Sequence, residues 1–223
     1  MEAAALQERP EDEIGKRLRA KREERGLSLR KLAARLEISP SALSQIETGR
    51  SRPSVSTLYA IVNELGISFD ELFPPAPGRS AAPAAGEPGA ITLRGLRHGP
   101  EELVQRMADR KVIEMASGVT WERLNPTGDR DVDFLEATYD VDGASSAGDT
   151  FMRHSGREYG LILSGRLRVT VGFDEYELEP GDSICFDSQQ PHRLATIGEE
   201  PVKAIWFVIG RHGSDARAEW GDA

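Results

Sequence analysis

Residues 74–90 constrain the fold more than any other feature, because they separate two segments whose hydrophobic patterns have different periods. They read PPAPGRSAAPAAGEPGA, and fourteen of these seventeen residues are Pro, Gly or Ala. This stretch has no large apolar side chain to anchor in a core, so we predict an extended, semi-rigid linker. The chain of 223 residues therefore divides into a domain at residues 11–73, the linker, a second domain at residues 91–210 and a polar tail at residues 211–223.

The segment before the linker carries the signals of five short helices. The first is predicted at about residues 11–25. Serines that can cap the starts of the next four are Ser28, Ser39, Ser54 and Ser68. Glycines that can end helices are Gly26, Gly49 and Gly66. Pro40 after Ser39 and Glu71 in a capping box with Ser68 strengthen two of these starts. The last helix would contain Phe69, Leu72 and Phe73.

The segment after the linker predicts one helix at residues 100–110 and then a series of short strands separated by turn residues. The predicted strands are residues 111–115, 119–124, 132–141, 150–154, 159–163, 167–171, 175–178, 183–186, 192–196 and 202–209. Many short strands with even turn spacing are typical of a sandwich or barrel. The fold class is therefore an α + β two-domain chain, helical first and β-rich second.

The charge is distributed unevenly along the chain. The whole chain has a net charge of −9, which argues against indiscriminate binding to nucleic acid. Residues 14–68, however, hold eleven Lys or Arg and five Asp or Glu, a net charge of +6. A basic segment in an acidic chain indicates a polyanionic partner for one domain only, and a solvated helix face laced with salt bridges is the alternative.

Several classes of protein are excluded by composition. No run of about 18 apolar residues is present, so we expect no transmembrane helix. The acidic N-terminus lacks the apolar core of a secretory signal, and we expect a cytoplasmic protein. Cys185 is the single cysteine, which excludes an internal disulfide and a cysteine-built zinc site. Its place in an alternating strand predicts a buried, small apolar side chain.

Residues 29–48 read LRKLAARLEISPSALSQIET, in which two helices meet at a tight turn. Residues that can share one core across this turn are Leu32, Leu36, Leu43 and Ile46. The small Ala33 suits the closest approach of the two helices. This arrangement resembles the helix-turn-helix of the XRE (phage-repressor-like) family, over residues 14–73. The resemblance implies a five-helix, lambda-repressor-like DNA-binding domain. Glu37 departs from the family, which usually has a left-handed glycine in the turn, at a cost of about 1 kcal/mol.

The resemblance implies that the third helix, about residues 40–48, lies in the major groove of DNA. Residues left on its outer face or at its start are Ser39, Ser41, Ser44 and Gln45. Gln45 is the expected base reader, because its amide can pair with the N6/N7 edge of adenine. Candidate phosphate contacts are Arg30, Lys31, Arg50, Arg52, Ser56 and Thr57. The alternative is a helical protein-interaction bundle in which Gln45 is an ordinary solvated residue.

Two patches in the second segment carry a further resemblance. Residues 152–160 read MRHSGREYG, and residues 179–186 read EPGDSICF, followed by Gln190-Pro191-His192. Together they resemble the two motifs of the cupin superfamily, over roughly residues 119–208. The implied fold is a double-stranded β-helix, or jelly-roll barrel.

Metal-binding cupins of this kind use a His-x-His pair, a glutamate and a later histidine. The corresponding residues here are Met152 in place of the first histidine, then His154, Glu158 and His192. A thioether is a poor ligand for hard or borderline divalent ions, but two histidines and a glutamate can hold zinc with an open position. The cofactor stays open: one divalent metal such as zinc, or no metal and a polar cluster that binds an organic ligand or fills the barrel mouth.

Other side chains of the second domain could line an effector cavity. The candidates are Trp121, Tyr139, Phe151, Tyr159 and Trp206 as apolar walls and Arg153 as the partner of an anionic group. The alternative for most of them is packing alone, since an aromatic side chain in a small barrel usually belongs to the core.

The order of the two domains resembles that of XRE–cupin transcriptional regulators. The resemblance implies a sequence-specific DNA-binding regulator, by analogy a repressor, whose cupin domain binds a small-molecule effector. A homodimer on a palindromic operator is the expected assembly. The first alternative is a cupin metalloenzyme, a dioxygenase or isomerase, with a DNA-binding appendage, against which Met152 counts. The second is an interaction module such as an antitoxin-like partner.

Overall fold

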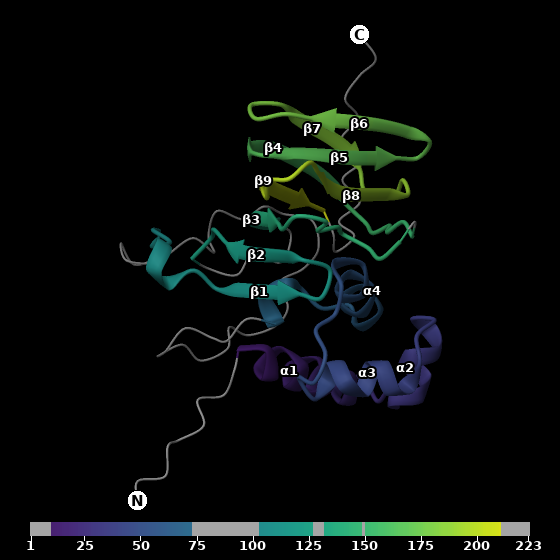
Figure 1. The fold of residues 1–223 in the computed structure, drawn as a ribbon. Helices are drawn as coiled ribbons and strands as arrows, with labels where there is room; N and C mark the ends of the chain where they lie inside the picture. Colours follow the sequence, from purple (N-terminus) through teal and green to yellow (C-terminus); the bar gives the residue numbers. More distant parts are fainter. Residues whose placement is uncertain (1–9, 73–102, 127–131, 149, 211–223) are drawn as a thin grey trace, which may run out of the picture.

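The computed structural model describes residues 10–72, 103–126, 132–148 and 150–210. The described residues form a helical part, called the head (residues 10–72), and a β-domain (residues 103–210), as Figure 1 shows. The predicted linker at residues 74–90, Phe73 and the predicted tail at residues 211–223 lie outside the described residues.

The head consists of four α-helices and one short 3₁₀ helix. Their bounds are α1 (Pro10–Glu24), α2 (Leu29–Arg35), α3 (Pro40–Glu47), α4 (Val55–Leu65) and η1 (Phe69–Leu72). The prediction of five α-helices is therefore wrong at the last one, which is a single 3₁₀ turn. Only half of the predicted capping box is formed: the Ser68 amide donates to the Glu71 carboxylate at 3.1 Å, but the Ser68 hydroxyl has no hydrogen-bond partner among the described residues.

Local capping explains where three of the α-helices begin. The hydroxyl oxygens of Ser28, Ser39 and Ser54 each accept a hydrogen bond from the backbone N–H three residues later, at 3.1–3.2 Å. Such bonds satisfy one of the unpaired amides of the first helical turn. Gly66 ends α4 in the left-handed conformation with φ 59°. These boundaries agree with the predicted ones because each depends on residues close in sequence.

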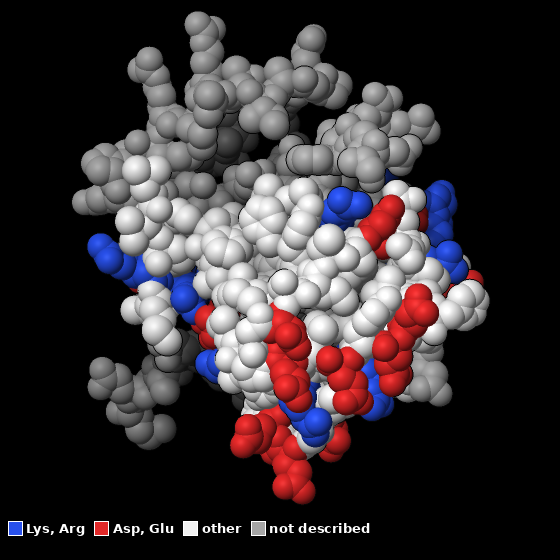
Figure 2. All heavy atoms as spheres, turned by 90° about the horizontal axis from the view of Figure 1, so that it is seen from above, with Lys and Arg blue, Asp and Glu red and all other residues white. Residues whose placement is uncertain are grey.

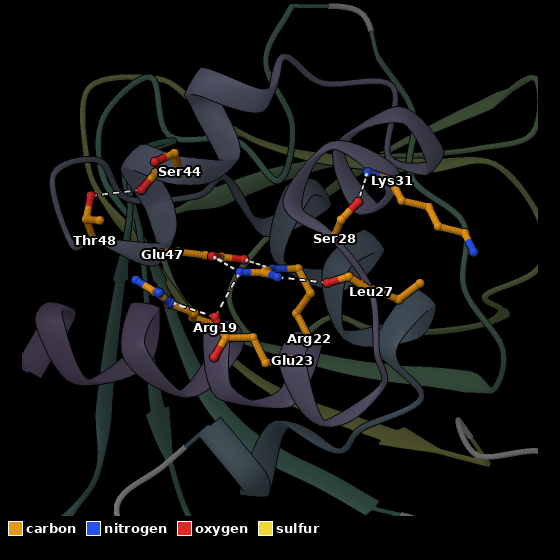
Figure 3. Close-up of polar contacts among 9 residues, drawn as sticks. All are labelled: Arg19, Arg22, Glu23, Leu27, Ser28, Lys31, Ser44, Glu47 and Thr48. Carbon is orange, nitrogen blue, oxygen red and sulfur yellow. Dashed lines mark hydrogen bonds and ion pairs between the residues drawn. The ribbon is translucent and has the colours of Figure 1, made fainter.

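Close packing and one buried ion pair fix α1 against α3. A Cβ on Gly15 would lie 2.4 Å from the carbonyl oxygen of Ile46, so only glycine permits this approach. Arg22 binds both carboxylate oxygens of Glu47, at 2.6 and 2.8 Å, and also the Leu27 carbonyl (Figure 3). Both side chains are buried. The hydrogen bonds that Arg22 donates to Glu47 raise the pKa of Arg22 above its usual range, against the effect of burial.

The β-domain contains nine strands in two antiparallel sheets among the described residues. The elements are η4 (Met107–Asp109), β1 (Val112–Met115), β2 (Val119–Arg123), β3 (Val132–Tyr139), β4 (Arg157–Ser164), β5 (Arg166–Val171), β6 (Asp174–Leu178), β7 (Ser183–Asp187), β8 (His192–Ile197) and β9 (Val202–Ile209). One sheet has the order β1-β2-β3-β9-β4-β7, and the other has the order β6-β5-β8. None of the described helices is long and apolar enough to span a bilayer.

Three local predictions for this part of the chain are wrong. Of the helix expected at residues 100–110, the described part holds only the 3₁₀ turn η4. Residues 150–154 form no regular strand; Met152 makes an isolated bridge to His192 instead. Cys185 is exposed rather than buried, because Phe186 takes the inward position on β7.

The head packs directly against the β-domain. We call this contact the head–sheet seam; its members are Arg52, Pro53, Ser56, Tyr59 and Phe69 of the head and Glu114, Ala116, Trp121, Ser145 and His154 of the β-domain. Backbone hydrogen bonds join Ala116 to Pro53 at 3.0 Å and Ser56 to Ser145 at 2.9 Å. Figure 1 shows α4 between the β-domain and the other helices of the head. The seam therefore brings the end of α4 that follows Ser54 next to the sheet.

Candidate functional site

The outer face of α3 is polar and open. Leu43 and Ile46 are buried in the core of the head, as their spacing predicted, while Ser41 and Gln45 are exposed. The Gln45 side chain makes no hydrogen bond with any described residue, so its amide is available to a partner outside the chain. Ser44 is half-buried, and Ser39 is exposed but its hydroxyl already caps the helix.

The residues predicted to contact phosphate divide into two groups. Arg30, Lys31 and Arg50 are exposed on the head, and Figure 3 shows Lys31 extending away from the other labelled side chains. Arg52 instead forms an ion pair with Glu114 of the β-domain, with Nη1 and Oε2 2.8 Å apart. The backbone N–H of Ser56 donates to the Ser145 carbonyl. The structure thus turns two of the predicted contacts toward the seam.

The Thr57 hydroxyl lies within the head. It forms a hydrogen bond with the Ser54 hydroxyl at 2.8 Å, beside the cap of α4. The Thr57 amide donates to the same oxygen at 3.1 Å. Thr57 therefore serves the start of the helix in this arrangement.

The far side of the β-domain is acidic. Figure 2 views this face from above, on the side away from the head, and acidic side chains gather on it. The strand β6 contributes three exposed acids, Asp174, Glu175 and Glu177. A polyanion is repelled by such a face, so DNA is expected to approach from the side of the head, whose residues 14–68 carry a net charge of +6.

Three buried side chains of the β-domain converge between its sheets. Glu158 lies on β4 of one sheet, His192 begins β8 of the other, and His154 precedes β4. Glu158 Oε1 is 2.8 Å from His154 Nε2 and 3.1 Å from His192 Nε2. The exposed fractions of these side chains are 0% for both histidines and 2% for the glutamate. We call His154, Glu158 and His192 the triad.

The outer nitrogens of the two imidazoles fix their tautomers. His154 Nδ1 lies 3.0 Å from the Ser155 carbonyl oxygen, and His192 Nδ1 lies 2.8 Å from the Gln190 carbonyl oxygen. A carbonyl only accepts, so each Nδ1 carries a hydrogen, and in the neutral form of each ring the lone pair of Nε2 points toward Glu158.

The inner atoms of the triad fit a cation. Neither Nε2 nor Glu158 Oε1 has a hydrogen bond of acceptable geometry within the described residues. Three unsatisfied lone-pair donors around one buried point, with both outer nitrogens bonded to carbonyls, form the arrangement that metal-binding histidines adopt. Tetrahedral zinc ligands stand about 3.3 Å apart, given bonds of about 2.0–2.1 Å. The candidate ligand atoms of His154, Glu158 and His192 all lie within 4.8 Å of one another, so these side chains can hold one divalent ion once their spacing adjusts to it.

The charges around the triad favour an ionised Glu158. Burial by itself raises the pKa of this carboxyl, but hydrogen bonds from Nε2 of His154 and His192, when these nitrogens carry protons, and the positive charge that comes with those protons lower it more, to about 2. Burial raises the pKa of the Tyr139 hydroxyl, and the negative charge of Glu158 raises it further. Tyr139 therefore stays protonated and faces the field of the ionised carboxylate.

Met152 lies beside the triad. Its side chain is buried, and its backbone exchanges two hydrogen bonds with His192, both at 3.0 Å. The predicted alternation of residues 151–154 is present. Met152 and His154 are buried on one face, whereas Phe151 and Arg153 are exposed.

The effector candidates also fall into two groups. Trp121, Tyr139 and Trp206 are buried, whereas Phe151, Arg153 and Tyr159 point outward. Tyr159 neighbours the inward Glu158 on β4, so strand alternation directs it away from the triad. The structure therefore brings only the first three toward the interior of the β-domain.

Sequence reasoning missed Tyr59, which comes from the head. Its ring stacks on His154 with centroids 4.1 Å apart and planes 5° from parallel. It also meets Trp121 edge-on at 5.6 Å. The helical pattern of α4 indicated only that Tyr59 is buried; no local signal in the sequence indicates contact with a histidine of the other domain.

A helix-turn-helix head joined to a two-sheet domain with a buried His–Glu–His cluster defines a class: DNA-binding proteins with a cupin domain. Comparisons with known families agree. The Helix-turn-helix family (HTH_3) matches residues 18–72, and the Cupin domain family (Cupin_2) matches residues 139–208.

Relatives and solved structures of the same organisation are known. The chain is 37% identical over 188 residues to the HTH-type transcriptional regulator SutR of Escherichia coli K12, covering 83% of this chain and 88% of SutR. It is 28% identical over 200 residues to the HTH-type transcriptional regulator PuuR of the same organism, and the match covers 89% of this chain and 93% of PuuR. The crystal structure of an HTH_3 family transcriptional regulator from Vibrio cholerae has the same fold, with a TM-score of 0.60 and 24% identity. The match covers 90% of this chain and 96% of that structure. The chain belongs to the family of HTH-type transcriptional regulators with a C-terminal cupin domain.

Proposed function

We propose that this regulator is a sequence-specific repressor that reads its operator with α3. The observation that carries the proposal is the exposed polar face of α3, with the Gln45 amide uncommitted, within the segment 14–68 whose net charge is +6. The analogy to repressors adds a steric reason, since a compact head bound at a promoter blocks polymerase. Such a regulator acts where the DNA is, in the cytoplasm.

The test begins with selection of a preferred duplex from random DNA by the full chain. Gln45→Ala is expected to weaken binding to that duplex by about 1–3 kcal/mol and to relax specificity at one position, because a bidentate base contact is lost. Gln189→Ala, which changes an exposed glutamine of the β-domain, is the matched control. Unchanged affinity in Gln45→Ala would remove this residue from the interface.

The predicted phosphate contacts have a separate signature. Arg50→Ala is expected to weaken binding to every sequence and to lower the slope of log affinity against log salt by about one. The same loss of affinity and the same change in slope are expected for Arg30→Ala and for Lys31→Ala. A slope equal to that of the unchanged chain would show that Arg50 does not neutralise a phosphate.

We also propose that the β-domain, built as a jelly-roll barrel, binds a small-molecule effector at the triad. In this proposal His154, Glu158 and His192 hold one divalent ion such as zinc, and the bound ion supplies a site with an open position for a donor atom of the effector. Trp121, Tyr139 and Trp206 supply the apolar surroundings. We propose a sensor rather than an enzyme, since Met152 stands where metal-binding cupins have a further histidine.

Elemental analysis of the purified full chain tests the metal, together with mass spectrometry of any retained small molecule. About one divalent ion per chain, lost in His192→Ala and kept in Glu177→Gln, is the expected result. Glu177 is an exposed acid on β6 and so serves as the control. A retained organic molecule with no metal would leave the triad as a hydrogen-bonding site for that molecule and remove the metal from the proposal.

A homodimer on a palindromic operator completes the proposal. Each chain carries one head, so a symmetric operator needs two chains. The outward face of β4 exposes Tyr159, Leu161 and Leu163, at 39%, 41% and 47%. Their neighbours on β9 continue this apolar stripe, with Phe207 opposite Tyr159 and Ile205 opposite Leu161. A contiguous apolar stripe on a soluble domain favours a protein interface, and we assign it to a second copy of the chain.

A further inference from the structure

Tyr59 connects the DNA-binding head to the triad. It lies in the middle of α4, has an exposed fraction of 2%, and stacks on His154 with the two rings 5° from parallel. Phe69 and Trp121 enclose the same ring edge-on, at 4.8 and 5.6 Å. With both triad histidines at 0% exposure, the wall that covers the triad on this side belongs to the head.

The same seam occupies groups that DNA would use. Arg52 is paired with Glu114, and the N–H of Ser56 at the start of α4 is bonded to the Ser145 carbonyl. Guanidinium groups and free amides at helix starts are what phosphates bind. One donor cannot serve the β-domain and a phosphate at the same time. The docked head therefore has fewer groups available for DNA than a released one.

We propose that Tyr59 forms a wall of the triad site, and that metal binding and head docking stabilise each other at the expense of DNA binding. This inference rests on the proposed DNA-binding and metal-binding functions. The head thus acts as a part of the effector site, and operator DNA competes with the β-domain for the head.

The direction of the coupling follows from the stacked geometry. A divalent ion on His154 Nε2 withdraws electron density from the imidazole. An electron-poor ring stacks more favourably on the π face of a phenol. Metal binding therefore strengthens the Tyr59–His154 contact, and with it the docked arrangement. By linkage, DNA that draws the head away weakens metal binding by the same factor.

The experiment measures both affinities on the full chain, with Zn²⁺ and the duplex selected from random sequence as probes. Saturating Zn²⁺ is expected to weaken binding of the duplex about fivefold or more, a typical coupling between two sites. Saturating duplex is expected to weaken Zn²⁺ binding by the same factor. Linkage requires the two factors to be equal, which checks that both titrations reached equilibrium, and a factor of one in both would overturn the coupling.

Variants at Tyr59 separate the ring from general packing. Tyr59→Phe keeps the stacked ring and is expected to keep the coupling. Tyr59→Leu removes it and is expected to reduce the coupling to less than twofold and to weaken Zn²⁺ binding to the chain without DNA. Tyr176→Leu makes the same change at an exposed tyrosine on β6, away from the seam, and is the control.

A surface variant covers the case in which Tyr59→Leu does not fold. Glu114 is half exposed, and Glu114→Gln breaks only its ion pair with Arg52. Tighter binding of the duplex in the presence of Zn²⁺ is expected. Glu175→Gln breaks an exposed ion pair with Arg168 within the β-domain, far from the head, and should change nothing.

Three results would overturn the inference. The first is equal coupling in the unchanged chain and in Tyr59→Leu. The second is a Zn²⁺ affinity that Tyr59→Leu leaves unaltered, and the third is no Zn²⁺ binding to the unchanged chain. The last two are measured without DNA. Failure to select any preferred duplex would instead overturn the proposed reading of DNA by α3, while the Zn²⁺ comparison would still decide the role of Tyr59.

Discussion

Glu37 occupies the turn between α2 and α3 in a left-handed conformation, with φ 55°. The sequence predicted this conformation, since related proteins usually have glycine there. A non-glycine residue in this region costs about 1–2 kcal/mol, while glycine adds about 0.4–1 kcal/mol of entropy to the unfolded chain. We expect Glu37→Gly to raise the free energy of unfolding by up to about 1 kcal/mol, measured by urea denaturation.

A control distinguishes this conformational effect from a general effect of glycine. Ala34 is exposed within α2, so Ala34→Gly is expected to lower the free energy of unfolding by about 1 kcal/mol. If Glu37→Gly destabilised the chain to the same degree, the turn would not be strained.

Glu47 is the buried partner of Arg22, with both carboxylate oxygens engaged. Removing it leaves the buried guanidinium with only the exposed Glu23 carboxylate, 3.6 Å from Nη2, as a counter-charge. Glu47→Ala is therefore expected to lower the free energy of unfolding by about 3 kcal/mol. Glu177→Ala removes an exposed carboxylate paired with Arg168, away from Arg22, and is expected to change stability little. Denaturant titration of both variants is the measurement, and similar losses would contradict the role assigned to burial.

At the scale of elements, the close packing of β4 against β9 depends on one glycine. A Cβ on Gly160 would lie 1.2 Å from the ring of Trp206 on the neighbouring strand. Gly160→Ala must displace this buried ring, and we expect a loss of about 1–3 kcal/mol, seen as a lower midpoint of thermal unfolding. The double variant Gly160→Ala/Trp206→Leu should lose less than the sum of its single changes, because the clash is gone. Additive losses would mean that the ring is not the obstacle.

The elements also show which local structures the sequence could predict. The starts of α2, α3 and α4 were predicted because a capping hydroxyl and its amide are three residues apart. The strand expected at residues 150–154 was not formed, since a strand needs a partner along its length and Met152 pairs at one point only. The last helix became a 3₁₀ turn, and only the bond from the Ser68 amide to the Glu71 carboxylate is formed of its predicted capping box.

At the scale of the whole molecule, the exposed stripe on β4 makes the assembly testable. Leu161→Glu places a charge in the proposed dimer contact and is expected to shift the chain from dimer to monomer in sedimentation velocity. Tyr176→Glu places a charge on β6, outside the apolar stripe of β4 and β9, and should leave the dimer intact. A monomeric unchanged chain, or a Leu161→Glu variant that remains dimeric, would contradict the proposed contact.

The sequence by itself determined the features that depend on neighbouring residues: the capped helices, the strained turn at Glu37, and the alternation that sends Glu158 inward and Tyr159 outward. It also indicated that His154, Glu158 and His192 belong together, through the spacing of two motifs. Only the tertiary structure decided that Tyr59 stacks on His154 and that Arg52 pairs with Glu114. Each of these contacts joins the head to the β-domain across a long stretch of chain, and no local pattern encodes such a meeting; it depends on how two folded surfaces fit.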